Sequence, residues 1–239
     1  MIAALILAGG QGIRFGTAGQ PKQFAEIDGK PLFIHALQTY LDLASVETIL
    51  LVANPDFMDS SVTALHEFGL AAHVHIAPGG DTRQESVRNG LGAITDLHEL
   101  REDDAIVLHN AASPNTPADT VTRCIAALDN ADVAQAYVPQ LRTIFEMDGQ
   151  QVGAVLPRSR LACSCDPTVY RAAALHRVMR RQEELGLLGD TTTDIALSLG
   201  MRIELVKSEQ RNMKITTRSD IDALQAAMRQ NGKDPEFAE

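Results

Sequence analysis

A glycine-rich stretch near the N-terminus, LILAGGQGIRFGTAGQPKQF, combines residue types that together can hold a phosphate group. An apolar run leads directly into Gly9, Gly10 and Gly12, and the basic residues Arg14 and Lys22 follow within the same stretch. Glycine lets the backbone approach an anion closely, so that N–H groups can donate to its oxygens, while the two cations neutralise its charge. The stretch therefore predicts a phosphate-binding loop that follows a strand.

Two well-known phosphate loops are excluded by their spacing. The dinucleotide loop G-x-G-x-x-G, begun at Gly10 and Gly12, requires a third glycine at the position of Phe15. The P-loop requires a Gly-Lys pair followed by serine or threonine, but the chain reads Gly29-Lys30-Pro31. A dinucleotide-dependent oxidoreductase is thus disfavoured, and an ordinary strand-to-helix turn stays open as the simplest alternative.

Three motifs together resemble those of the nucleotidyltransferases that act on sugar and polyol phosphates. The loop reads L-A-G-G-x-G-x-R-x-G and is followed by PKQF at 21–24; residues 79–87, GGDTRQESV, fit G-G-x-x-R-x-x-S-V; residues 212–216, NMKIT, fit N-[IM]-K-[IV]-T. Within this group the chain resembles the cytidylyltransferases that act on 2-C-methylerythritol 4-phosphate and on ribitol 5-phosphate. The resemblance implies CTP as a substrate, Mg2+ or another divalent cation as the cofactor and, for the first acceptor, a step of isoprenoid biosynthesis.

The resemblance also assigns roles to residues of the nucleotide half of the site. Cations would stabilise the triphosphate and the leaving pyrophosphate, because the transition state of phosphoryl transfer spreads negative charge over several oxygens. These catalytic cations are Arg14, Lys22 and Lys214. The residues that would bind the nucleotide, through the loop backbone or close to the cytosine and ribose, are Ala8, Gly9, Gly10, Gly12, Gly80, Arg83 and Ser86.

The segment LHNAASPN, residues 108–115, departs from the family pattern H-D-A-A-R-P at two positions. Asn110 stands where the family has an aspartate that ligates Mg2+, and Ser113 stands where it has an arginine. An amide oxygen carries no net charge, so Asn110 would be a weak or water-mediated metal ligand. Serine cannot replace a bidentate guanidinium. His109 matches the family's histidine, but the sequence gives it no partner at triad spacing.

The residues that the resemblance places around the acceptor are partly changed as well. The family's D-T-[LMI]-K becomes RTIF at 142–145, and its T-P-Q becomes Asp166-Pro167-Thr168, which inserts a carboxylate near an anion site. Thr143, Arg158 and Thr193 match the family and would bind the acceptor, with Arg158 reaching the acceptor phosphate of the other subunit.

Two hypotheses follow, because the departures gather on the acceptor half and at one metal position. In the first, the chain is an active cytidylyltransferase that forms a CDP-polyol and releases pyrophosphate. Its default acceptor is 2-C-methyl-D-erythritol 4-phosphate, and the alternative is ribitol 5-phosphate or another phosphorylated or phosphonylated compound. In the second, the chain is a CTP-binding relative with weakened catalysis. The sequence leaves both open.

Apolar runs that are typical of strands alternate with helical segments along the chain. The strands are expected at 2–7, 48–52, 72–76, 105–108, 132–138 and 201–206, and the helices at 31–43, 55–68, 82–94, 116–128, 167–185 and 217–228. Such alternation favours a mainly parallel sheet covered by helices on both faces. Together with the resemblance, it predicts an α/β, three-layer Rossmann-like nucleotidyltransferase fold with a mainly parallel mixed sheet.

The region 140–165 breaks this alternation, with a turn at Asp148-Gly149 and no helical stripe. We expect a projecting β-arm and, because an isolated hairpin is marginally stable, we expect it to pair with a second subunit in a homodimer. Residues 1–230 are expected to form a single nucleotidyltransferase domain that includes this arm, followed by a disordered tail at 231–239.

The composition limits the partners and the location. A net charge of −10 without a basic stripe disfavours nucleic acid. No apolar run approaches 18 residues, so no membrane span is expected. The three cysteines, Cys124, Cys163 and Cys165, are too few for a disulfide framework and favour packing over a metal site. The sequence therefore predicts a cytoplasmic protein whose partners are CTP, a small phosphorylated polyol and a second copy of itself.

Overall fold

The structure, a computed structural model, describes residues 1–10, 21–185 and 191–231. Among these residues, seven strands form the main sheet: β1 (Ile2–Ala8), β4 (Thr48–Ala53), β5 (His75–Pro78), β6 (Ala105–Asn110), β7 (Val133–Pro139), β10 (Ala162–Arg171) and β11 (Ile203–Lys207). Two short pairs accompany it: β2 (Glu26–Ile27) with β3 (Lys30–Pro31), and β8 (Ile144–Asp148) with β9 (Gln151–Leu156).

The described helices are α1 (Leu32–Leu41), α2 (Met58–Glu67), α3 (Arg83–Leu97), α4 (Ala118–Ala127), α5 (Ala172–Leu185), α6 (Thr192–Ser198) and α7 (Arg218–Asn231). Single 3-10 turns cover Lys22–Phe24, Pro55–Phe57 and Arg158–Arg160. None of the helices in the described ranges is long and apolar enough to cross a membrane.

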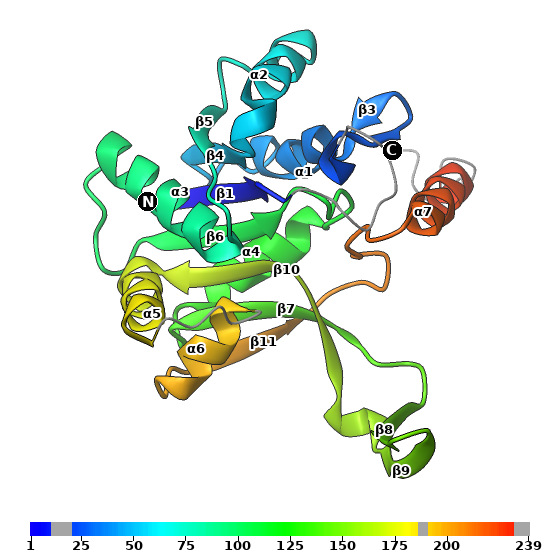
Figure 1. Cartoon of the computed structure of the whole chain (residues 1–239). Helices are drawn as coiled ribbons and strands as arrows, with labels where there is room; N and C mark the ends of the chain where they lie inside the picture. The colour runs from blue at the N-terminus through cyan, green and yellow to red at the C-terminus, as the bar shows by residue number, and fades with distance from the viewer. Residues whose placement is uncertain (11–20, 186–190, 232–239) are drawn as a thin grey trace.

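The main sheet is mixed and mostly parallel, with the order β11-β7-β10-β6-β1-β4-β5 (Figure 1). Strand β1 pairs in parallel with β4 and β6, β4 with β5, and β11 with β7, whereas β10 runs antiparallel to β6 and β7. The carboxyl ends of β1, β4 and β6 therefore meet at one edge of the sheet, where open α/β sheets bind their ligands.

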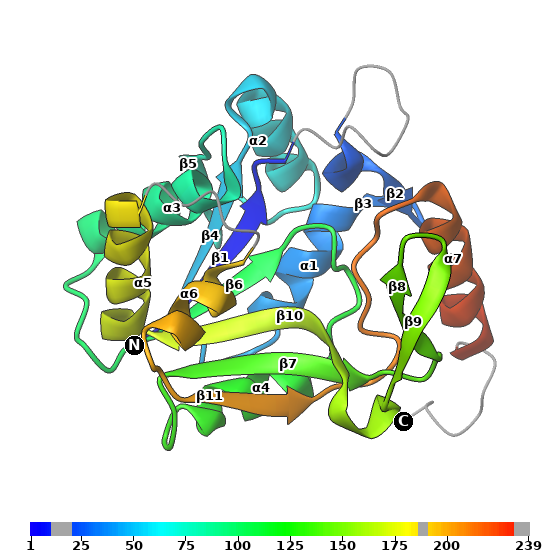
Figure 2. The same ribbon diagram turned by 60° about the horizontal axis from the view of Figure 1, so that its bottom comes forward.

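Helices cover both faces of the sheet, as Figures 1 and 2 show. Alternate residues of β1 point to opposite faces: Ala4 and Ile6 join a cluster with α1, α2 and α4, while Ala3 and Leu5 join a cluster with α3, α5 and α6. Strands buried on both faces read as continuous apolar runs, which is why the sequence pattern located them. The three-layer fold that the sequence predicted is confirmed.

Helix α3 packs closely on the sheet because it carries a glycine at the point of contact. A Cβ at Gly90 would lie 2.4 Å from Cδ2 of Leu5 and 2.8 Å from Cγ2 of Val52. At its N-terminus, α3 begins with a capping box. The Thr82 side chain accepts from the Glu85 N–H, and the Glu85 side chain accepts from the Thr82 N–H, each at 3.1 Å. This cap fixes where the helix begins at the edge of the sheet.

The expected helix at 167–185 is wrong in its first part. Strand β10 continues to Arg171, and the helix begins only at Ala172. The proline suggested a helix start, but Pro167 lies where the register between β10 and β7 shifts, between Ser164 and Thr168, so that its missing N–H costs no ladder hydrogen bond. The residues that follow it, Thr168-Val169-Tyr170, are β-branched or aromatic and pair with β6 and β7.

Other differences are smaller. Strand β5 begins at His75 rather than at 72, because residues 71–73 form a turn, and α6 was not expected. The hairpin at 140–165 is present: β8 and β9 are joined at Asp148-Gly149, where Gly149 has a φ of 61°, and Figure 1 shows them projecting from the sheet. The expected tail beyond residue 231 lies outside the described residues.

Candidate active site

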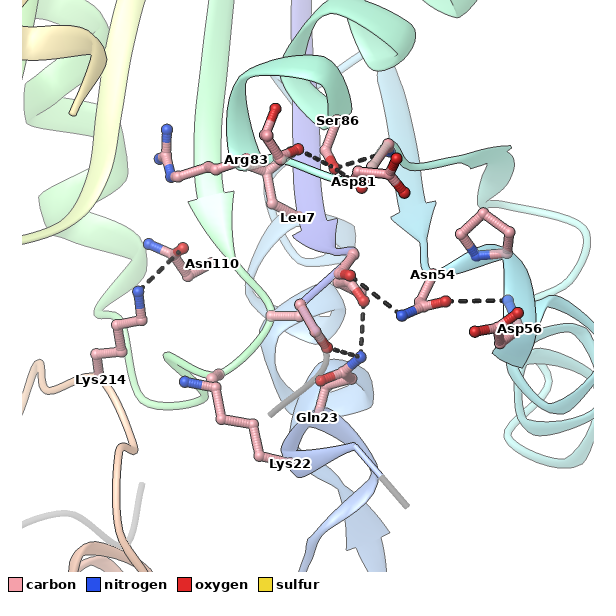
Figure 3. A pocket seen from close by; sticks show the side chains of 18 residues that line it. Leu7, Lys22, Gln23, Asn54, Asp56, Asp81, Arg83, Ser86, Asn110 and Lys214 are labelled. Atoms are coloured by element: carbon pink, nitrogen blue, oxygen red, sulfur yellow. Dashed lines mark hydrogen bonds between the residues drawn. The ribbon is translucent and has the colours of Figure 1, made fainter. Parts of the chain in front are cut away.

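A cavity of about 380 Å³ lies at the carboxyl ends of β1, β4 and β6 (Figure 3). Its walls come from the end of β1 and the following glycines, the turn after β4, the N-terminus of α3, the turn after β6, and two lysines. These lining residues are Leu7, Ala8, Gly9, Gly10, Lys22, Gln23, Asn54, Pro55, Asp56, Gly80, Asp81, Thr82, Arg83, Ser86, Asn110, Ala111, Ala112 and Lys214. Of the residues predicted for the nucleotide half, Gly12 and Arg14 lie outside the described residues.

Two amide side chains tie down the glycine loop by its carbonyl groups. Gln23 Nε2 donates to Ala8 O at 2.7 Å and to Gly10 O at 3.1 Å, and Asn54 Nδ2 donates to Gly9 O at 3.3 Å. With these carbonyls engaged, residues 8–10, the part of the loop that the structure describes, are held at the cavity wall. The sequence motifs indicate no role for either amide, although Gln23 lies within the PKQF segment at 21–24.

The glycine loop and α3 touch at a place where no side chain fits. A Cβ at Gly9 would lie 2.7 Å from the hydroxyl oxygen of Ser86. That hydroxyl accepts from the Gly80 N–H at 3.1 Å and donates to Thr82 O at 3.0 Å, and Ser86 is buried. Ser86 therefore holds Gly80 and the first turn of α3 in place, and the N-terminal end of this helix offers partial positive charge to an anion in the cavity.

Two lysines predicted to bind the triphosphate converge on the same cavity from separate segments (Figure 3). Lys22 Nζ donates to Ile215 O at 3.2 Å, and Lys214 Nζ donates to Asn110 Oδ1 at 3.3 Å. The segment that carries Lys214 is fixed beside β6, because the Ile215 N–H donates to Ala112 O at 2.8 Å. The structure thus brings Lys22 into contact with Ile215, which lies 193 positions further along the chain.

Asn110, Ser113 and Asp166, three of the positions at which the sequence departs from the family pattern, contact one another. The Asn110 amide nitrogen donates to both carboxylate oxygens of Asp166, at 2.8 and 3.0 Å, and the backbone N–H of Asn110 donates to one of them at 3.2 Å. The Ser113 hydroxyl also donates to the Asp166 carboxylate. Sequence reasoning noted Asp166 but did not connect it to Asn110.

Only one end of the Asn110 amide is therefore available to ligate a metal ion. Its amide nitrogen faces Asp166, and its oxygen, which faces Lys214, is the one atom of this side chain that could ligate a cation. Among the residues that the structure describes, no three His, Cys, Asp or Glu side chains gather in a way that would hold a metal ion. Asn110 Oδ1 could contribute one neutral oxygen ligand to a divalent cation, so most of the ligands of such a cation would have to come from other sources.

His109 fixes the turn that follows β6. Its Nε2 lies 2.9 Å from Ser113 O, an acceptor, so Nε2 carries the proton and Nδ1 accepts from the Tyr40 hydroxyl at 2.8 Å. Burial lowers the pKa of His109 below its usual 6.5, although the Asp166 carboxylate and the hydrogen bond to Ser113 oppose this shift. His109 is accordingly neutral near pH 7 and has a structural role.

The depressed pKa of His109 predicts that the protein loses stability in mild acid. Below the ordinary pKa of about 6.5 the unfolded chain binds a proton that the folded chain excludes, so the free energy of unfolding should fall by up to about 1.4 kcal/mol per pH unit from this residue. Urea titrations of wild type and His109→Gln at pH 7.5 and 5.5 measure it. A loss that is equally steep in the variant would assign the acid sensitivity to other groups.

The three residues predicted to bind the acceptor are not brought to this cavity within one chain. Thr143 is exposed just before β8. Arg158 follows β9 at the open end of the hairpin, opposite the turn at Asp148-Gly149, and its Nη1 donates to Leu141 O at 2.8 Å. Thr193 lies in the first turn of α6, and its hydroxyl donates to Gln135 Oε1 at 3.2 Å. None of the three is among the described residues that line the cavity.

Comparison with known proteins decides the family. The family model of 2-C-methyl-D-erythritol 4-phosphate cytidylyltransferase, IspD, matches residues 2–230. The chain belongs to this family. A solved structure of 4-diphosphocytidyl-2C-methyl-D-erythritol synthase superimposes with a TM-score of 0.78 over 95% of this chain and 98% of that one, at 26% identity. The chain is thus a nucleotidyltransferase of the cytidylyltransferase class, with the nucleotidyltransferase fold.

The proteins that are similar to this chain are named for different acceptors and differ in length. The chain is 36% identical over 224 residues, 93% of its length, to the bifunctional enzyme IspD/IspF of Sphingopyxis alaskensis, and it spans only 54% of that longer relative. It is 28% identical over 228 residues to the ribitol-5-phosphate cytidylyltransferase of Lactiplantibacillus plantarum, covering 95% of this chain and 97% of the relative. Family membership therefore establishes the class of reaction, and the acceptor is a separate question.

Proposed function

We propose that the protein transfers the cytidylyl group of CTP to the phosphate of a small polyol phosphate, with 2-C-methyl-D-erythritol 4-phosphate as the first candidate, and releases pyrophosphate. The observation that carries this proposal is the convergence of Lys22, Lys214, the glycine loop and the N-terminus of α3 on one cavity. A triphosphate needs several cations and backbone N–H groups within a small volume, and the two lysines, Gly9, Gly10 and the start of α3 are the groups around this cavity that support the proposal.

The reaction is an in-line displacement at the α-phosphorus of CTP. An oxygen of the acceptor phosphate forms the new P–O bond, the bond from the α-phosphorus to the bridging oxygen breaks, and the electron pair of that bond leaves with pyrophosphate. Lys22 and Lys214 would stabilise the charge that develops on the leaving group, together with Arg14. Gly80, Arg83 and Ser86 would lie against the nucleoside, since they form the wall at the start of α3.

A divalent cation would reduce the charge of the triphosphate and would be held mainly by its oxygens. Asn110 Oδ1 is the candidate protein ligand, direct or through water. This chain's own contribution is to position the triphosphate between Lys22 and Lys214.

We also propose that the acceptor half of the site is completed by a second copy of the chain. Thr143 and Arg158 lie on the projecting hairpin and do not line the cavity of their own chain. A homodimer in which the hairpin of one copy reaches the cavity of the other would unite the two halves. The described cysteines are unpaired, which is compatible with a reducing compartment such as the cytoplasm.

Two alternative functions are each supported by one observation. Ribitol 5-phosphate is an alternative acceptor because a relative named ribitol-5-phosphate cytidylyltransferase is similar over nearly the whole chain. A CTP-binding protein with weakened catalysis is the other, because Asn110 and Ser113 replace charged residues of the family pattern.

A pyrophosphate-release assay with CTP and a panel of polyol phosphates separates these possibilities. We expect release with CTP and one acceptor, dependent on a divalent cation, and none with CTP alone. Calorimetric binding of CTP without release for any acceptor would support the weakened homologue. Absence of CTP binding would contradict the proposed function altogether.

A further inference from the structure

Asp166 is a buried carboxylate directly behind the cavity. It lies on β10, and only 6% of its surface is exposed. Its carboxylate oxygens accept from neutral donors that the structure describes, namely the side-chain and backbone N–H groups of Asn110 and the hydroxyl of Ser113. A buried carboxylate is costly unless several hydrogen bonds compensate it, so a set of donors this complete points to a defined role.

Asp166 lies beside the end of β6. The last ladder pair of β10 with β6 is Thr168 with Leu108, and Asp166 lies two residues beyond this pair, where it contacts Asn110, the last residue of β6. Its backbone is held from the other side as well, because Asn212 Nδ2 donates to Asp166 O at 2.6 Å. Hydrogen bonds to the end of β6 on one side and to Asn212 on the other therefore hold Asp166 in place.

The carboxylate determines which end of the Asn110 amide faces the cavity. Both carboxylate oxygens of Asp166 accept from the amide NH2 of Asn110, at 2.8 and 3.0 Å, so it is the nitrogen end of the amide that faces Asp166. The amide oxygen is then turned toward Lys214, whose Nζ lies 3.3 Å away. A neutral partner at 166 would leave the amide free to present either end.

We propose that Asp166 is a positioning residue: it holds the Asn110 amide with its oxygen toward Lys214 and the cavity. The carboxylate, the amide and the ammonium group form one polar chain. Asp166 does not line the cavity itself but contacts Asn110, which does. By orienting the Asn110 amide, Asp166 sets the oxygen that accepts from Lys214. The proposal rests on the proposed function of this cavity in binding CTP.

This arrangement has a consequence for the substitution that would restore the family's aspartate. Asn110→Asp alone would place a second carboxylate about 3 Å from Asp166, and like charges at that distance disfavour ionisation of both. The single variant should therefore bind CTP with Mg2+ no more tightly than wild type. The reciprocal exchange Asn110→Asp/Asp166→Asn keeps one carboxylate and one amide in contact and faces the carboxylate toward Lys214.

The first measurement needs no substrate. In uniformly 15N-labelled protein, the Asn110 side-chain NH2 signals are identified by their loss in Asn110→Ala. We expect them to be shifted downfield and slow to exchange in wild type and in Ser113→Ala, and to lose both properties in Asp166→Asn. Ser113→Ala is the matched control, because it removes a donor to Asp166 but leaves the contact between Asp166 and Asn110. Unchanged Asn110 signals in Asp166→Asn would overturn the proposal.

The second measurement is a double-mutant cycle on CTP binding in Mg2+, by calorimetry. We expect the Asp166→Asn substitution, made in the wild-type background, to weaken CTP binding about tenfold. This is the size of effect expected when a hydrogen bond to a charged group is lost. We expect no further weakening in the Asn110→Ala background, because the residue through which Asp166 acts is absent. Ser113→Ala should stay within about twofold of wild type. An equal loss of affinity in both backgrounds would mean that Asp166 supports only the fold, and would overturn the proposal.

The outcomes distinguish this inference from the proposed function. If wild type fails to bind CTP, the function is wrong, while the amide signals still decide whether Asp166 orients Asn110. If Asp166→Asn does not fold, the reciprocal exchange, which restores a contact between a carboxylate and an amide, is tested for folding and for CTP binding in its place. Recovery of folding and of CTP binding by the exchange supports the proposal, and an exchange that fails while Asn110→Ala folds and binds CTP contradicts it.

Discussion

Lys214→Ala and Lys22→Ala should each reduce the rate of cytidylyl transfer by about 10²- to 10³-fold, the range seen when one preorganised donor to a developing negative charge is removed. Both ammonium groups line the cavity, and each is held by an oxygen acceptor, Ile215 O for Lys22 and Asn110 Oδ1 for Lys214. Such anchoring keeps the charge in place before CTP arrives, so little reorganisation is needed in the transition state.

The affinity for CTP should fall less than the rate. A charge-assisted contact contributes about 1–3 kcal/mol to binding, and the glycine loop and the start of α3 remain in either variant. Steady-state kinetics of pyrophosphate release and calorimetry with CTP separate the two effects. Lys30→Ala is the control, since Lys30 is exposed on β3 and does not line the cavity. If both cavity variants keep the wild-type rate and affinity, the cavity is not the triphosphate site.

The grouping of several predicted residues around one cavity could be predicted because these residues lie in local sequence motifs. Gly9, Ser86 and Lys214 each belong to a short pattern, and parallel strands bring the ends of β1, β4 and β6 to one edge whatever the details of packing. Apolar runs buried on both faces gave the strands directly. What the motifs could not give is which groups touch, such as the Gly9 backbone and the Ser86 hydroxyl.

The contact between Asp166 and Asn110 could not be predicted for a specific physical reason. The two residues lie 56 positions apart, and their contact depends on the antiparallel register of β10 and β6. Reading Pro167 as the start of a helix removed that strand from the expected sheet, and with it the contact. A β-branched and aromatic triplet after a proline, Thr168-Val169-Tyr170, was the available signal for a strand that resumes beyond an irregularity.

The hairpin supports a second prediction with a large expected effect on activity. We expect that no single chain contains a complete active site. It exposes a row of large apolar side chains: Leu141 (63%), Phe145 (52%), Met147 (75%), Val152 (59%) and Val155 (63%). Apolar surface of this kind on a two-stranded hairpin is unfavourable in water unless another surface covers it. Because Arg158 lies at the same hairpin, an arm that pairs with a second copy would carry this guanidinium with it.

A mixing experiment tests the shared site. Arg158→Ala and Lys214→Ala should each be nearly inactive alone. In a mixed dimer, one site combines both substitutions, whereas the other receives the intact Lys214 of one chain and the intact Arg158 of its partner. After unfolding and refolding an equimolar mixture, half of the dimers are mixed, so roughly a quarter of the wild-type activity should return, as expected for a two-fold symmetric dimer.

Two controls make the result interpretable. Refolded wild type sets the full activity, and each variant refolded alone sets the background. Removing residues 144–156, the paired strands β8 and β9, should give a monomer by sedimentation that binds CTP but releases no pyrophosphate. Mixing that restores nothing, while the mixed dimer forms, would mean that Arg158 and Lys214 do not meet in a site shared between the two chains. Each site would then depend on the residues of one chain only, and the hairpin would not bring Arg158 to the cavity of its partner.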